Sequence, residues 1–154
     1  MWPWMVALAT LLAAAGAALA DCNHPAAINF APGVASATVA SDDSVPTAEC
    51  YQVTAQAKQE LGMFIESTGK GPVLEVYAPG WTASCDAFDE CSISGTLMSD
   101  PGDTEWTDTL TDTGAYLIVV DNPHSDEYRL TVEIHSSGAD RQCTRPSRDD
   151  TCIV

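Results

Sequence analysis

Apolar and polar residues alternate along most of the chain after Cys22. The segment "EYRLTVEIH" (127–135) shows this most clearly. One side carries the apolar residues Tyr128, Leu130, Val132 and Ile134, and the other carries Arg129, Thr131, Glu133 and His135. Because successive side chains of a strand point to opposite faces, this period of two predicts a β-strand with one face in a core.

Similar short segments recur between turns rich in Gly, Pro, Asp and Ser. They cover residues 34–40, 50–57, 61–67, 72–80, 92–98, 105–110 and 115–120. In 115–120 both faces are apolar, so this strand is expected to be buried on both sides. Residues 48–61 contain good helix formers, but the alternation favours a strand. The pattern predicts an all-β single domain, an antiparallel β-sandwich or jelly-roll-like arrangement of about seven to eight short strands.

The N-terminus has the pattern of an export signal. "MVALATLLAAAGAALA" (5–20) is apolar, and Ala18-Leu19-Ala20 before Asp21 fits the rule for signal-peptide cleavage. No Lys or Arg precedes this apolar segment, unlike in a usual signal peptide. An uncleaved membrane anchor is the less favoured alternative. The expected organisation is a signal peptide (1–20), a β-sandwich domain (21–135) and a polar C-terminal tail (136–154). The mature protein is expected to be secreted or periplasmic, without membrane insertion.

Six cysteines lie after this signal, and an even number in an exported protein predicts disulfide bonds. They are Cys22, Cys50, Cys85, Cys91, Cys143 and Cys152. Cys85 with Cys91 and Cys143 with Cys152 are plausible local pairs, which would leave Cys22 with Cys50 and tether the tail. The sequence does not choose among the pairings. Zinc is disfavoured because no Cys-x-x-Cys spacing occurs.

The formal net charge is −16. Such a surface repels nucleic acid and anionic membranes, and it would attract a cationic protein partner or simply keep the chain soluble. Two acidic loops contain Asp86, Asp89, Glu90, Asp100, Asp103, Glu105 and Asp108. A calcium ion needs roughly six to eight oxygen ligands that converge on one point. The residue spacing of an EF-hand calcium loop is absent from the sequence. No cofactor is therefore predicted, with a structural calcium ion as the open alternative.

Four segments, taken in order, resemble a known family. "CYQVTAQAKQEL", "LEVYAPGW", "WTDTLTDTGAYLIVV" and "YRLTVEI" resemble the strands of bacterial pre-peptidase C-terminal (PPC) domains. The same pattern occurs in periplasmic inhibitors of I-type lysozyme, and the resemblance covers residues 28–135. Lys58 and Asp108 stand where these proteins commonly have Gly, so a turn or bulge is expected to differ there.

The resemblance implies a partner-binding loop at Thr113, Gly114 and Tyr116. In the inhibitor family a Ser-Gly-x-Tyr loop inserts into the lysozyme cleft, and here Thr113 replaces the Ser. A purely structural role is the favoured alternative: Gly114 allows the backbone to turn, and Tyr116 is a large plug at the strand entrance with its hydroxyl near the sheet end.

No catalytic signature is present. His124, Ser125 and Asp126 are adjacent in "NPHSDEY", but a nucleophilic triad needs groups that converge in space. This segment is better explained as a hairpin loop. The sequence therefore predicts no enzyme. It predicts a secreted non-catalytic binding protein, in its sharper form an inhibitor of a cationic lysozyme. The alternatives are a structural or accessory PPC-like module with a cell-surface or extracellular partner and, last, a small hydrolase.

Overall fold

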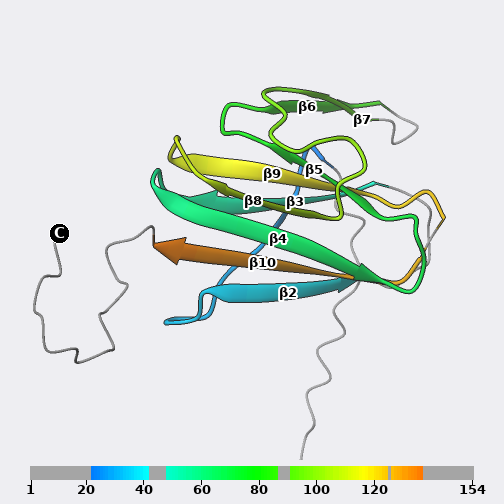
Figure 1. Ribbon diagram of the computed structural model, residues 1–154. Helices are drawn as coiled ribbons and strands as arrows, with labels where there is room; N and C mark the ends of the chain where they lie inside the picture. Colours follow the sequence, from blue (N-terminus) through cyan, green and yellow to red (C-terminus); the bar gives the residue numbers. More distant parts are fainter. Residues whose placement is uncertain (1–21, 42–47, 87–90, 125, 137–154) are drawn as a thin grey trace, which may run out of the picture.

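Two four-stranded sheets face each other in the computed structural model, which describes residues 22–41, 48–86, 91–124 and 126–136 (Figure 1). The described strands are β1 (Ala26–Ala27), β2 (Ser36–Ser41), β3 (Glu49–Ala55), β4 (Gln59–Ser67), β5 (Val73–Tyr77), β6 (Thr82–Cys85), β7 (Cys91–Ser94), β8 (Glu105–Thr109), β9 (Gly114–Asp121) and β10 (Tyr128–Ser136). This confirms the predicted all-β class, including a strand rather than a helix at Glu49–Ala55.

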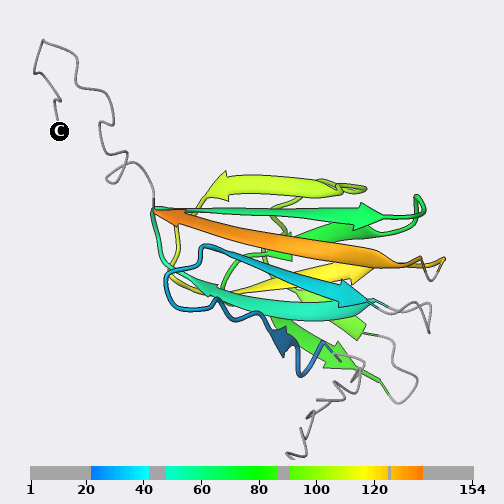
Figure 2. The same ribbon diagram turned by 90° about the horizontal axis from the view of Figure 1, so that it is seen from below.

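The first sheet has the order β1-β3-β9-β5 and the second the order β2-β10-β4-β8. Figure 2 shows the second sheet from β8 at the top to β2 below. All named strand pairs are antiparallel except β1 with β3. The predicted hairpin between β9 and β10 is wrong, because these strands belong to different sheets.

The core lies between the sheets. It takes alternate residues from the facing strands, such as Val53 of β3, Met63 of β4, Ile118 of β9 and Leu130 of β10. The predicted inward face of β10 is confirmed at Tyr128, Leu130 and Val132, all buried. Thr131 points the other way but is also buried, since it lies between Thr38 and Phe64 in the ladder and shares a 3.1 Å hydroxyl–hydroxyl hydrogen bond with Thr38.

Strand β9 is buried on both faces, as its sequence predicted. Tyr116, Ile118 and Val120 enter the core between the sheets. Leu117 and Val119 enter a second cluster on the outer face of the first sheet. The small β6–β7 sheet covers that cluster, and it lies beside β5 and β9 in Figure 1. Neither β1 nor β6 was predicted. Of the strand expected at 92–98, only residues 92–94 belong to a named strand, β7, and Leu97 forms an isolated bridge with Tyr77.

Two disulfides form in the described part of the chain, Cys22–Cys50 and Cys85–Cys91. The first ties the N-terminal segment to β3, and both of its cysteines are buried. The second closes the β6–β7 hairpin. Cys143, Cys152, the signal segment 1–20 and most of the predicted tail lie outside the described residues. Within the described ranges, no helix is long and apolar enough to cross a membrane.

Candidate functional site

Three connections meet at the end of the sandwich where β9 begins. They are residues 110–113 between β8 and β9, called the β8–β9 loop below, the turn 56–58 between β3 and β4, and Pro79 after β5. The Ala57 amide donates a hydrogen bond of 2.9 Å to Thr113 Oγ1. The Lys58 amide donates one of 2.7 Å to the Leu110 carbonyl oxygen. The turn 56–58 thus binds the β8–β9 loop at both of its ends, Leu110 and Thr113.

Thr113, Gly114 and Tyr116, the residues predicted from the resemblance, have three different environments. Thr113 is exposed and Gly114 is half-buried, whereas Tyr116 is only 1% exposed. The Tyr116 hydroxyl donates a 2.6 Å hydrogen bond to the Asp112 carbonyl oxygen. Burial of the ring is the main cause of a raised pKa for Tyr116. Tyr116 thus holds the loop from inside, while the Thr113 side chain lies at the surface.

Gly114 is constrained by its contact with Pro79. Its φ is 154°, and a Cβ added there would lie 2.9 Å from the Pro79 Cβ atom. Real Cβ atoms essentially never approach so closely, so any side chain at position 114 would displace the end of β5 or the start of β9. Glycine is therefore required for the close packing of these two segments.

Trp81 supports the same strand entrance, a role that was not predicted. Its indole Nε1 donates a 3.0 Å hydrogen bond to the Ala115 carbonyl oxygen. Gly95 makes room for it, because a Cβ at Gly95 would lie 3.1 Å from the Trp81 Cα atom. The Trp within "LEVYAPGW" was visible in the sequence, but nothing local indicated that its N–H group would reach β9.

An altered turn or bulge was expected at Lys58 and at Asp108, where the resembling proteins commonly have Gly, and the two positions differ in the structure. Lys58 has a φ of 71° in a turn closed by a 3.1 Å hydrogen bond from the Gln59 amide to the Gln56 carbonyl oxygen. A positive φ at the third position of a four-residue turn is typical of a type II turn and favours Gly. Asp108, by contrast, lies in regular β8 opposite Leu61, so no altered turn or bulge occurs there.

At the opposite end of the sandwich, a buried polar cluster joins the sheets. The hydroxyls of Tyr51 on β3 and Tyr128 on β10 are 2.9 Å apart, and both donate to Glu49 Oε2. Burial first, and then the Glu49 charge, raise the pKa of Tyr51. Every hydroxyl in the cluster therefore has a partner, which indicates a structural role.

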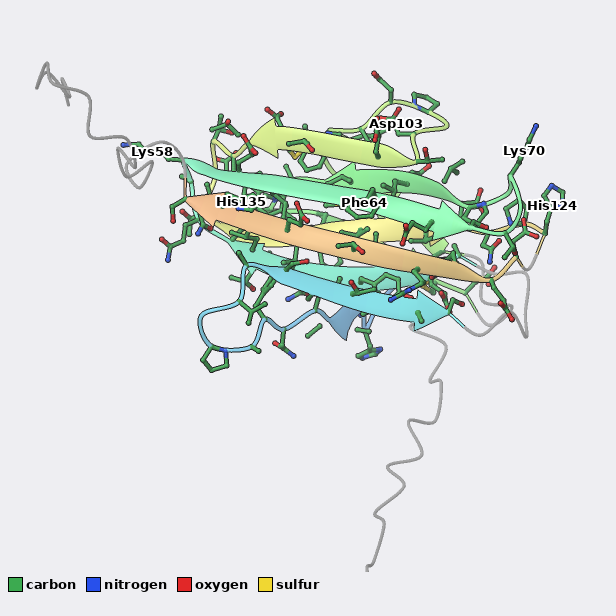
Figure 3. The ribbon with its side chains drawn as sticks, turned by 60° about the horizontal axis from the view of Figure 1, so that its bottom comes forward. Lys58, Phe64, Lys70, Asp103, His124 and His135 are labelled. Carbon is green, nitrogen blue, oxygen red and sulfur yellow. A yellow bond between two sulfur atoms is a disulfide. The ribbon has the colours of Figure 1, made fainter. Side chains whose placement is uncertain are left out.

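Of the adjacent residues His124, Ser125 and Asp126, the structure describes the first and the last. The Asp126 amide donates to Asn122 Oδ1 at 3.1 Å, and Asn122 Nδ2 donates to the Asp126 carbonyl at 2.9 Å. Asp126 Oδ2 accepts a 3.2 Å hydrogen bond from the Gly71 amide. His124 is exposed at this end, far from Lys58 at the other (Figure 3). Ser125 lies outside the described residues.

The acidic loops bring no metal-binding group together in the described ranges. There, no three His, Cys, Asp or Glu side chains are placed to hold an ion. Asp103 Oδ2 instead accepts a 2.8 Å hydrogen bond from the Asp100 amide within its own turn. Asp89 and Glu90 of the other acidic loop lie outside the described residues.

A solved structure shares this fold. The chain is similar to PliG from Aeromonas hydrophila, a periplasmic inhibitor of g-type lysozyme, with a TM-score of 0.55 and 22% identity over 72% of this chain and 96% of that one. A mutant of PliG from Escherichia coli gives a TM-score of 0.46 and 16% identity over 71% and 96%. No family model and no curated protein matches the sequence. The likeness concerns the fold, and the PPC-like resemblance stays a prediction.

Proposed function

We propose that this protein is an exported lysozyme inhibitor, cleaved after residue 20, whose β8–β9 loop and Thr113 obstruct the substrate cleft of the enzyme. The observation that carries the proposal is the exposed Thr113 held on a fixed backbone by Ala57, Tyr116 and Trp81. A loop that is already ordered loses little conformational entropy on binding. The shared fold with an inhibitor of g-type lysozyme makes that enzyme class the first target.

The acidity of the chain supports a cationic target. A formal net charge of −16 would accelerate association with a basic enzyme, and salt would weaken this effect. In this proposal Gly114 and Tyr116 position the loop and do not themselves contact the enzyme. Neither is a suitable site for a test of contact, because Gly114 packs on Pro79 and Tyr116 fills the core.

Asp112 provides a cleaner test. Its side chain is exposed, and Tyr116 binds only its backbone carbonyl. Asp112→Arg should therefore change the tip of the loop; it removes the 3.0 Å hydrogen bond that Thr111 Oγ1 donates to Asp112 Oδ2 but keeps the hydrogen bonds made by Ala57, Tyr116 and Trp81. The matched control is Asp121→Arg, which makes the same charge change at an exposed position at the other end of β9. Cell-wall lysis by g-type, I-type and c-type lysozymes is measured with each purified mature protein.

We expect the wild type and Asp121→Arg to inhibit at least one lysozyme type and Asp112→Arg to lose at least tenfold in potency, roughly the loss of one interfacial hot spot. Equal potency of all three proteins would reject the loop as the inhibitory element. No inhibition of any lysozyme by the wild type would reject the inhibitor function. An accessory module of the PPC-like kind would then explain the chain better.

A further inference from the structure

The two outer faces of the sandwich differ. The β6–β7 hairpin covers the outer face of the first sheet, where Trp81, Ala83 and Ile93 pack on Leu117 and Val119. Within the described ranges, no strand lies on the outer face of the second sheet (Figure 3). Outward side chains of its central strands, such as Phe64 of β4 and Arg129 of β10, are therefore exposed to solvent, although Thr131 is buried between its neighbours.

A groove of about 380 Å³ lies on this open face, and Gly62, Phe64, Glu105, Thr107 and Glu133 contribute to its lining. Gly62 pairs with Thr107 on one side and Glu133 on the other, so a position without a side chain sits between two that have one. A Cβ at Gly62 would lie 3.1 Å from Thr107 Oγ1. The glycine therefore determines the depth of the groove.

Phe64 forms the apolar wall of this groove. It is the next outward residue on β4 after Gly62, and 36% of its surface is exposed. Figure 3 shows its position midway along the sheet, away from both ends. It lies beside Glu105 in the ladder, and Glu133 lies across from Gly62. The exposed ring thus has the Glu105 carboxylate directly beside it, Thr131 on its other side, and the Glu133 carboxylate diagonally across Gly62.

No lysine or arginine lines the groove. Arg129, on the same face of β10, lies four residues from Glu133, which is about 13 Å along a strand. His135 Nε2 is 3.5 Å from Glu133 Oε2, but both side chains are about half exposed and remain accessible. The negative charge in the groove is therefore available to a ligand.

We propose that this groove is a docking surface for an arginine or lysine side chain carried by a basic protein partner. The apolar stem and the cationic group would lie over the Phe64 ring, and the two carboxylates would hold the charge. Charge complementarity selects this occupant, because the whole chain carries a formal net charge of −16. The surface is separate from the β8–β9 loop and does not depend on that loop's function.

The probe is a fluorescein-labelled amidated peptide with three arginines separated by glycines, titrated into the ¹⁵N-labelled mature protein at low salt. We expect amide shifts at Gly62, Phe64 and Thr107 and none at Ala83, which lies in the β6–β7 hairpin over the first sheet. Shifts confined to the β8–β9 loop, or spread evenly over the acidic surface, would overturn the proposal.

Two substitutions separate the groove from general acidity. Glu105→Gln with Glu133→Gln should raise the Kd for the peptide about fivefold or more. The matched control, Glu66→Gln with Glu127→Gln, removes the same charge at one end of the same sheet and should change the Kd less than about twofold. Equal losses in both double variants would mean that only net charge attracts the peptide.

Phe64→Leu tests the aromatic wall. It keeps an apolar side chain but removes the ring, and a lost cation–π contact at an exposed site should raise the Kd about threefold. An unchanged Kd would remove the aromatic contact from the proposal and overturn it. Urea midpoints of all variants are measured alongside, so that a change in folding is not mistaken for a change in binding.

Discussion

Replacing Lys58 by glycine should stabilise the protein, although it removes a whole side chain. Lys58 has a φ of 71°, in the left-handed region. An L-residue pays roughly 1–2 kcal/mol there because its Cβ atom crowds the backbone. The Lys58 side chain is exposed, so little packing is lost on its removal. Glycine also keeps the amide that donates to the Leu110 carbonyl oxygen.

The gain is partly offset in the unfolded state. Glycine gives the unfolded chain more freedom, which costs about 0.4–1 kcal/mol on folding. The net increase in the free energy of unfolding should therefore be about 0.5–1 kcal/mol. With a urea m-value of about 1–3 kcal/mol/M, the midpoint would rise by roughly 0.2–1 M.

Lys58→Ala is the control for this prediction. It removes the same charge but retains the Cβ atom, so the strain at position 58 remains. Its free energy of unfolding should lie within about 0.5 kcal/mol of the wild-type value, as for an ordinary exposed substitution. Urea unfolding followed by tryptophan fluorescence compares the three proteins. If the glycine variant is no more stable than the alanine variant, the turn is not strained and the reasoning fails.

Three further predictions concern packing, support of the loop and pH. Val132→Ala should lower the free energy of unfolding by about 2–4 kcal/mol and Thr131→Ala by only about 1, as measured in urea; equal losses would contradict the assigned faces of β10. Trp81→Phe should speed hydrogen exchange in residues 113–116 several-fold and affect the centre of β9 less, since it keeps an aromatic ring but removes the hydrogen bond to Ala115. Burial raises the pKa of Tyr77 from 10.0 to about 12, so the unfolded chain loses that proton first and stability should fall as pH rises from 10 to about 12. Tyr77→Phe should make this loss of stability with pH smaller. If urea melts at several pH values show the same loss in Tyr77→Phe as in the wild type, Tyr77 is not its cause.

Period-two alternation predicted the strands and their faces because each sheet has one face in a shared core. β9 illustrates both the success and its limit. Its two apolar faces were evident from residues 115–120, but the sequence did not indicate what covers the second face. The covering strand β6 is short and polar, "TASC", and it has no apolar alternation to recognise. Its position depends on the Cys85–Cys91 disulfide and on packing against Leu117 and Val119.

The candidate site was predicted only in part, for a related reason. The resemblance indicated where the loop lies, but the roles of its residues depend on contacts between distant segments. The Ala57 amide that binds Thr113 is 56 residues away in sequence, and Trp81 is 34 residues from Ala115. The error of placing β9 and β10 in one hairpin arose likewise, because neighbouring strands in sequence usually pair and here they do not.

The loop and the groove are close enough for one partner to contact both. β4 leads from the Lys58 turn to Gly62, and four residues of strand span about 13 Å. A standard interface buries about 800 Å² on each partner, which corresponds to a patch roughly 30 Å across. If a basic lysozyme occupies both surfaces, Asp112→Arg and the Glu105/Glu133 double substitution should each weaken its binding. If the groove serves another basic protein, the double substitution should weaken peptide binding and leave lysozyme inhibition unchanged at moderate salt.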